Sequence, residues 1–123
     1  NCSERLDAPF DGEESITLYA DLEAGISGSM SSALLPEKIA PVIDHFWNNE
    51  KDKAEEIYNN ILPLINFENR QCGFRATKTV MKEGGVIKSD FCRDPIKPLD
   101  EDTKNLLLNF AKRYDLLTYK WGK

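Results

Sequence analysis

The sequence has 123 residues, of which 41% are apolar and 30% are charged. That balance is too apolar for a disordered tail, and no apolar run approaches the ~20 residues that a membrane-spanning helix requires. The net charge of −5 argues against a nucleic-acid-binding protein, because such proteins need a basic face to neutralise phosphates. We therefore expect a soluble globular chain that contacts neither a membrane nor nucleic acid.

The three cysteines, Cys2, Cys72 and Cys92, are widely spaced, and the chain has no Cys-x-x-Cys pair and only one histidine. This pattern does not fit a disulfide framework or a zinc site, and it favours reduced thiols in a cytoplasmic protein. We interpret Cys72 and Cys92 as half-buried packing residues and His45 as a packing or surface residue, because no catalytic partner lies at a diagnostic spacing. The sequence predicts no metal site and no cofactor.

The first predicted helix covers residues 13–24. Asp11 can act as its N-cap, Glu14 supplies the acid of a capping box, and Gly25 ends it. The small-residue run 26–33 that follows is typical of a short strand or turn in which the backbone approaches another group closely.

Four further helices are predicted from apolar residues at helical spacing and from capping signals: 36–47, 52–65, 72–83 and one that Asp100 caps. Pro41 falls inside the first of these and is expected to kink or restart it. Residues 86–98 are expected to form an extended connection. The helices should pack on one another through six apolar residues: Ile43, Trp47, Ile57, Ile61, Val80 and Phe110.

No pattern of residues predicts a catalytic centre within the chain. Every lysine falls on a polar helical face, in a cap region, in the connection or in the tail. Nothing there would lower the pKa of a lysine enough to make it a Schiff-base nucleophile. Composition and spacing alone therefore indicate a helix-rich chain without a catalytic group.

Several stretches, in order along the chain, resemble the C-terminal portion of the dihydrodipicolinate synthase / N-acetylneuraminate lyase family. The run Asn69-Arg70-Gln71-Cys72-Gly73-Phe74-Arg75-Ala76 and the closing Trp121-Gly122-Lys123 are most similar to the 2-keto-3-deoxy sugar acid dehydratases of that family. The other stretches that carry the resemblance are Pro9–Glu14, Ala24–Met30, Pro36–Trp47, Leu62–Leu64, Glu83–Ile87 and Arg93–Pro95.

The resemblance implies an α/β fold class, in which the chain is a C-terminal fragment of a (β/α)₈ barrel and is predominantly helical as it stands. Residues 1–47 would form the last two β/α units, with parallel strands near 5–10 and 26–31, and residues 48–123 a C-terminal helical bundle. A complete barrel needs about 250 residues, and the first residue is not methionine, so we expect a truncated chain.

The resemblance also implies one wall of a substrate pocket, because barrel chemistry occurs at the C-terminal ends of the strands. A glycine after the seventh strand, an acid two residues later and a serine after the eighth strand line the polyol pocket of the sugar-acid lyases. The matching residues are Gly12, Glu14 and Ser32. Met30 corresponds to the position whose backbone faces the keto-acid end. Glu14 also has a structural interpretation as the N3 acid of its helix, and Ser32 as a strand-end serine bonded to its own turn.

The implied function is that of a class I Schiff-base lyase that dehydrates a small-molecule 2-keto-3-deoxy sugar acid in the cytoplasm. The whole enzyme would be a homo-oligomer, either a dimer or a tetramer. The Schiff-base lysine and its assisting tyrosine would lie upstream, so we expect no catalytic residue in this chain and no activity from it alone. Aldol cleavage and dihydrodipicolinate synthase-type pyruvate condensation remain alternatives on the same scaffold. An alternative of another class is a helical interaction module without enzymatic activity.

Overall fold

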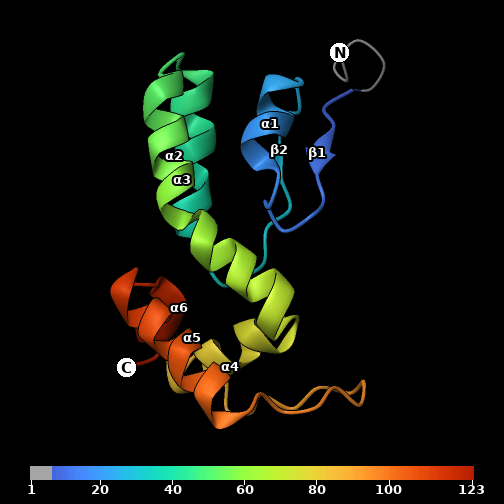
Figure 1. Cartoon of the computed structure of the whole chain (residues 1–123), viewed down its shortest axis with the longest axis vertical. Coiled ribbons are helices and arrows are strands. Elements are labelled where there is room, and N and C mark those ends of the chain that lie inside the picture. Colours follow the sequence, from blue (N-terminus) through green and yellow to red (C-terminus); the bar gives the residue numbers. More distant parts are fainter. Residues whose placement is uncertain (1–6) are drawn as a thin grey trace. The chain divides into compact units, whose positions relative to one another are not determined.

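A computed structural model describes residues 7–123, and α-helices dominate it (Figure 1). The chain divides into two compact units. The N-terminal unit contains the described residues up to Ser32 together with Pro36–Ile65, and the C-terminal unit contains Ala33–Leu35 and Asn66–Lys123. The elements in chain order are β1 (Phe10–Asp11), α1 (Leu18–Glu23), β2 (Gly28–Ser29), α2 (Pro36–Trp47), α3 (Lys51–Phe67), the π-helical turn η2 (Glu68–Cys72), α4 (Arg75–Glu83), α5 (Glu101–Arg113) and α6 (Leu117–Lys120).

Two short parallel strands, β1 and β2, begin the N-terminal unit, and α1 connects them. Phe10 pairs with Gly28, and Asp11 pairs with Ser29. A Cβ atom on Gly28 would lie 2.7 Å from the Phe10 ring, so a larger residue at position 28 would displace this exposed ring. The predicted strand–helix–strand order with parallel strands is confirmed. Of the first predicted strand, at residues 5–10, residues 5 and 6 lie outside the described residues, and the strand observed in the remainder begins only at Phe10 and ends at Asp11.

The predicted capping box at Asp11 and Glu14 is wrong. Helix α1 begins only at Leu18, after Thr17, whose side chain does not cap it. Glu14 has a φ of 54°, which is incompatible with a position inside a helix. The Asp11 carboxylate instead accepts a hydrogen bond from the Glu13 N–H at 3.1 Å. Residues 13–17 therefore form a turn that precedes the helix, and Glu14 is not its N3 acid.

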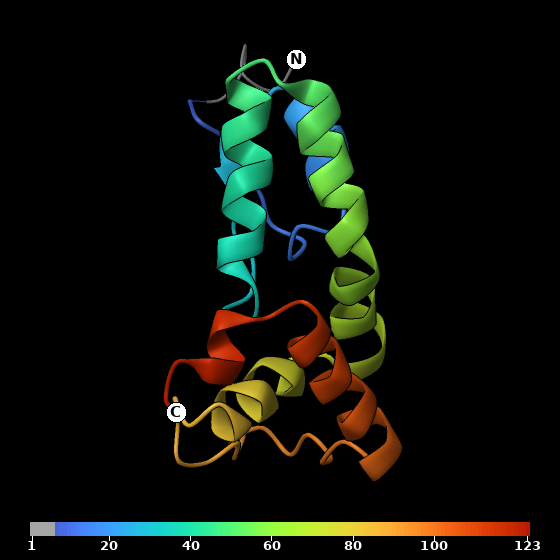
Figure 2. The ribbon, with the colours of Figure 1, turned by 90° about the vertical axis from the view of Figure 1, so that its left-hand side faces the viewer.

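Helices α2 and α3 form an antiparallel pair joined by a short turn (Figure 2). Pro41 does not interrupt α2, because the helix is held by a buried face that includes Ile39, Val42 and Phe46 on both sides of the proline. Phe46, and not the predicted Trp47, is the buried aromatic residue, and Trp47 is 55% exposed. The two differ because the helical phase of Ile39 and Val42 continues to position 46.

Helix α3 begins one residue before Asp52, which therefore does not cap it as predicted. Within the N-terminal unit, Tyr19 of α1 packs against one aromatic ring from each of the other two helices. It lies edge-on to Phe46 of α2 at 5.9 Å and stacks with Tyr58 of α3 at 6.3 Å, measured between ring centroids. These contacts join the connecting helix α1 to α2 and α3.

The C-terminal unit packs α4, α5 and α6 around the fully buried residues Val80, Leu107, Ala111 and Leu116. The helix predicted from residue 72 begins at Arg75, because η2 and a turn come before it. The predicted cap of α5 is confirmed. Asp100 accepts hydrogen bonds from the Thr103 N–H at 2.9 Å and the Thr103 hydroxyl at 2.7 Å, and both bonds lower the pKa of Asp100.

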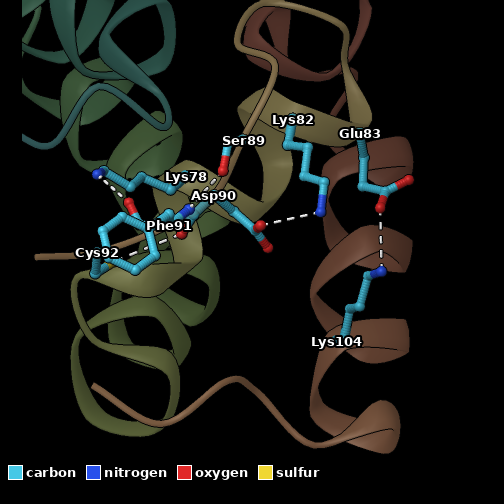
Figure 3. Close-up of polar contacts among 8 residues, drawn as sticks. All are labelled: Lys78, Lys82, Glu83, Ser89, Asp90, Phe91, Cys92 and Lys104. Carbon is cyan, nitrogen blue, oxygen red and sulfur yellow. Dashed lines mark hydrogen bonds and ion pairs between the residues drawn. The ribbon is translucent and has the colours of Figure 1, made fainter. Parts of the chain in front are cut away.

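The segment between α4 and α5 is extended, as predicted, and side chains of α4 bind it (Figure 3). The Lys78 ammonium donates to the Phe91 carbonyl at 2.7 Å, and Lys82 pairs with Asp90 at 2.9 Å. The bond from Lys82 lowers the pKa of Asp90. None of the helices of residues 7–123 is long and apolar enough to cross a membrane.

The chain after α6 returns to the end of α4, where the Gly122 N–H donates to the Gly84 carbonyl at 2.9 Å. This approach leaves no room for a side chain at position 84, because a Cβ atom there would lie 2.0 Å from the Thr118 carbonyl oxygen. The Thr118 hydroxyl donates to the Leu34 carbonyl at 2.9 Å and so binds the 33–35 segment to the same unit.

We predict that Gly84→Ala lowers the free energy of unfolding by about 1–3 kcal/mol, because the new methyl group forces the α4 and α6 backbones apart. Chemical denaturation followed by circular dichroism measures the loss. Glu83→Ala is the matched control, since it removes only an exposed ion pair to Lys104 and should cost less than ~1 kcal/mol. Equal losses for the two variants would contradict this packing.

Candidate functional site

The ends of β1 and β2 carry a hydrogen-bonded group of three side chains, Asp11, Ser15 and Ser29, which we call the strand-end network. The Ser29 hydroxyl donates to Asp11 Oδ2 at 3.0 Å. The hydroxyl oxygens of Ser29 and Ser15 lie 2.7 Å apart. Because Ser29 has a single hydroxyl proton and gives it to Asp11, Ser15 is the donor in the second bond.

Burial makes these bonds necessary. Asp11 is 5% exposed and Ser15 is 0% exposed, so unpaired polar atoms there would lose their hydration without compensation. Both Asp11 carboxylate oxygens have donors, because Oδ1 accepts from the Glu13 N–H and Oδ2 accepts from Ser29. The network is thus a satisfied polar cluster in the interior of the N-terminal unit.

Tyr58 of α3 binds the other side of the turn. Its hydroxyl donates to the Ile16 carbonyl at 2.6 Å and lies 3.3 Å from the Ser15 carbonyl. Burial, together with the charges of Asp11 and Asp21, raises the pKa of Tyr58 to about 12. The phenol therefore stays protonated at neutral pH and keeps its role as a donor to the turn.

The four predicted pocket residues all lie just beyond the ends of the strands. Gly12 follows β1 and Met30 follows β2, and the Met30 N–H donates to the Asp11 carbonyl at 2.9 Å. A Cβ atom added to Gly12 would lie 3.7 Å from Met30 Cε, so the Met30 side chain lies next to Gly12. Glu14 is exposed in the turn after β1, and Ser32 is half-buried after β2.

Gly12 and Glu14, beyond the end of β1, are not committed to packing or polar contacts with the described residues. Nothing in the described part of the chain would clash with a side chain at position 12, so glycine is not required there by the packing of residues 7–123. The Glu14 carboxylate makes no hydrogen bond or ion pair with those residues. Met30 is 61% exposed. The strand ends thus present an uncommitted carboxylate, open backbone and an apolar side chain.

Sequence reasoning missed the strand-end network. The sequence around Asp11 does indicate a structural role for its side chain, but the Asp-x-x-Glu spacing fits a capping box as well as it fits a turn. Ser29 could have been found only with the parallel register in hand, which pairs it with Asp11. Ser15 had no signal, because only the structure shows that it is buried.

Within residues 7–123, the histidine and the two cysteines have a structural partner or are buried. His45 pairs with Glu50 and lowers the pKa of that carboxyl group. Cys72 and Cys92 are buried, which is more than the half-burial predicted. Burial, then the charges of Glu68 and Asp100, raise the pKa of Cys72 to about 11. Among residues 7–123 no lysine is buried, and no three His, Cys, Asp or Glu side chains gather as a metal site would require.

Comparison with known proteins places these residues in a family context. The family model described as the dihydrodipicolinate synthetase family matches residues 7–113. An L-2-keto-3-deoxyarabonate dehydratase from Azospirillum brasilense is 44% identical over 117 residues, which cover 95% of this chain and 38% of that protein. A 4-hydroxy-tetrahydrodipicolinate synthase from Geotalea uraniireducens is 25% identical over 118 residues, or 94% of this chain and 40% of that protein. The chain therefore spans about two fifths of the length of these relatives.

Two solved structures share the fold. A dihydrodipicolinate synthase from Rhodopseudomonas palustris has a TM-score of 0.78 and 24% sequence identity, over 89% of this chain and 36% of that one. A monomeric dihydrodipicolinate synthase variant has a TM-score of 0.75 and 23% identity, over 87% and 35% respectively. The described chain thus has the fold of about one third of a dihydrodipicolinate synthase.

We predict that Cys72 and Cys92 do not react with a thiol reagent in the folded protein at pH 8. Both are buried, and with a pKa of about 11 only about one Cys72 thiol in a thousand is ionised at that pH. A Cys2→Ser variant removes the cysteine outside the described residues. In this variant, mass spectrometry measures the rate at which the reagent labels the two remaining thiols. We expect labelling of the folded protein to be at least about 100-fold slower than labelling of the protein unfolded in urea. Rapid labelling of folded Cys72 would contradict the structure.

Proposed function

Because the chain belongs to the dihydrodipicolinate synthetase family, we propose that it is the C-terminal part of a lyase that dehydrates a 2-keto-3-deoxy sugar acid. The observation that carries this proposal is the 44% identity to an L-2-keto-3-deoxyarabonate dehydratase across 95% of the chain. The identity to the 4-hydroxy-tetrahydrodipicolinate synthase is much lower, at 25% over a similar length.

In this proposal β1 and β2 are the last two strands of a (β/α)₈ barrel. Residues 1–47 form its last two β/α units, and residues 48–123 form the helical bundle that follows. The parallel β1–α1–β2 unit supports this assignment, as does the fold shared with about one third of a dihydrodipicolinate synthase. The exposed apolar side chains of Phe10, Met30 and Trp47 in the N-terminal unit would then be covered by the rest of the barrel.

The chemistry begins with an amine that this chain does not supply. A lysine in an upstream part of the whole protein attacks the C2 keto group of the substrate, and water leaves as the imine forms. The imine acidifies the C3 hydrogen, so a base removes that proton and the C4 hydroxyl leaves as a second water molecule. Hydrolysis of the imine then returns the lysine. No described lysine is buried, and this supports a Schiff-base lysine outside this chain.

Residues of this chain would hold the polyol part of the substrate. The Glu14 carboxylate, which has no partner among the described residues, would accept a hydrogen bond from a substrate hydroxyl. Ser32 would bind a second hydroxyl. Gly12 would let the substrate approach the backbone, and the backbone of Met30 would face the keto-acid end. The position of the Met30 side chain next to Gly12 supports a common wall at the strand ends.

The scaffold also fits two other reactions of keto acids. Retro-aldol cleavage would break the C3–C4 bond of the same imine, and condensation with pyruvate would make a bond at the equivalent carbon. The 25% identity to a 4-hydroxy-tetrahydrodipicolinate synthase keeps condensation as the second candidate. The homo-oligomeric state that the resemblance implies stays a prediction.

We predict that the full-length protein converts 2-keto-3-deoxypentonate into a product that is one water molecule lighter and releases no pyruvate. Mass spectrometry of the product and a coupled pyruvate assay measure the two outcomes. Stoichiometric pyruvate would identify an aldolase instead.

Glu14→Ala in the full-length protein should lower kcat/KM by about 10- to 100-fold, which is the effect of losing one hydrogen bond to a charged group.

Glu13→Ala is the matched control for that variant. It removes a neighbouring exposed carboxylate and leaves the Glu13 N–H bond to Asp11 in place. Its kcat/KM should stay within about twofold of the starting protein, since surface substitutions away from a site have small effects. An equal loss in both variants would refute the assignment of Glu14 to the polyol pocket.

A further inference from the structure

We propose that the strand-end network is a positioning device for substrate binding, in which Ser29 and Ser15 hold the Glu14 carboxylate in place without touching the substrate. The inference rests on the proposed function, because it assumes that Glu14 binds the polyol. It adds two residues, Ser15 and Ser29, that act on the site through the conformation of the turn.

The first support is backbone strain at the turn. Glu14 and Ser15 have φ values of 54° and 69°, so two consecutive non-glycine residues occupy the left-handed region. Such conformations are costly for side chains with a Cβ atom, and they persist only where the surroundings hold them. The strained residues are the proposed substrate ligand and the residue next to it.

The second support is the set of bonds that hold the turn in this conformation. Ser15 is fully buried, and its hydroxyl is bonded to Ser29 on β2. The Asp11 carboxylate receives the Glu13 N–H on one oxygen and the Ser29 hydroxyl on the other. The Tyr58 hydroxyl holds the following carbonyls. The turn is thus bound at Glu13, Ser15 and Ile16, and the exposed Glu14 side chain lies between these bound residues.

The third support is that Ser29 has no proton left to donate to a substrate. It donates its single proton to Asp11 and accepts the Ser15 proton, so its hydroxyl already serves the network as both donor and acceptor. Loss of this hydroxyl would leave Ser15 without its acceptor and Asp11 with one donor fewer. The turn could then relax toward ordinary φ values, and the Glu14 carboxylate would lose its orientation. A misplaced ligand weakens substrate binding more than it affects bond breaking at the distant keto end.

A double-mutant cycle in the full-length enzyme tests the proposal, with Ser29→Ala and Glu14→Ala alone and combined. Ser29→Ala should raise KM for 2-keto-3-deoxypentonate about five- to tenfold and change kcat less than about twofold, since one hydrogen bond is lost. In the Glu14→Ala background the same change should leave KM unaltered, because the ligand that it positions is already gone. Ser29→Thr keeps the hydroxyl and should restore the original KM.

Two variants serve as checks in the same assay. Ser27→Ala removes an exposed hydroxyl just before β2 and should leave KM unchanged. Ser15→Ala breaks the network from its other end and should raise KM as Ser29→Ala does, so the test does not depend on one variant being well folded.

The outcomes separate this proposal from the proposed function. If Glu14→Ala raises KM, and Ser29→Ala raises KM by the same factor with and without Glu14, then Glu14 binds substrate and the positioning role is wrong. The positioning role is also wrong if Ser29→Ala and Ser15→Ala leave KM unchanged while Glu14→Ala raises it. If Glu14→Ala itself leaves KM unchanged, the assignment of Glu14 fails and the positioning role fails with it. A Ser29 effect that disappears without Glu14 supports both.

Discussion

The parallel register of β1 and β2 places Asp11 beside Ser29, and the remaining contacts of the strand ends follow from that pairing. Parallel strands cannot be joined by a tight turn, so the chain must cross over through α1 and return at the same edge. Both strands therefore end together, and the residues that follow each strand meet there. The Met30 side chain lies next to Gly12 for this reason, although the two residues are far apart in sequence.

Burial of the Asp11 carboxylate is the energetic consequence of that register. An isolated buried charge is strongly unfavourable, whereas one with donors on both oxygens is tolerated. Asp11 obtains its donors from Ser29 and from the Glu13 N–H, and the second bond bends the chain away from a helix. The strain at Glu14 is offset by these bonds, which links the stability of the N-terminal unit to the geometry of its candidate site. The buried polar side chains of Asp11 and Ser15 and the strained backbone of exposed Glu14 occur together because one hydrogen-bond network holds all three.

Local signals in the sequence were sufficient where the structure depends on local interactions. The helical periodicity of α2 and the Asp100 cap of α5 follow from such signals. The parallel order of β1 and β2 was implied by the family resemblance and not by a local signal. The errors concern long-range contacts. The spacing of Asp11 and Glu14 suits a capping box, and only the bond to Ser29, a residue 18 positions away from Asp11, decides for a turn. Phe46 continues the buried face of α2, and its ring packs edge-on to Tyr19 of α1, a long-range contact that the sequence did not predict.

Trapping of the Schiff base tests the central claim most directly, that this chain supplies the polyol wall of the pocket and not its reactive amine. Borohydride reduction of the full-length protein with a 2-keto acid converts the imine into a stable amine, and peptide mapping then locates the modified lysine. The account predicts one modified lysine, upstream of the 123 residues in this chain. Modification of a lysine within it, such as Lys78 on α4, would contradict the account, because it would place the reactive amine in the C-terminal unit.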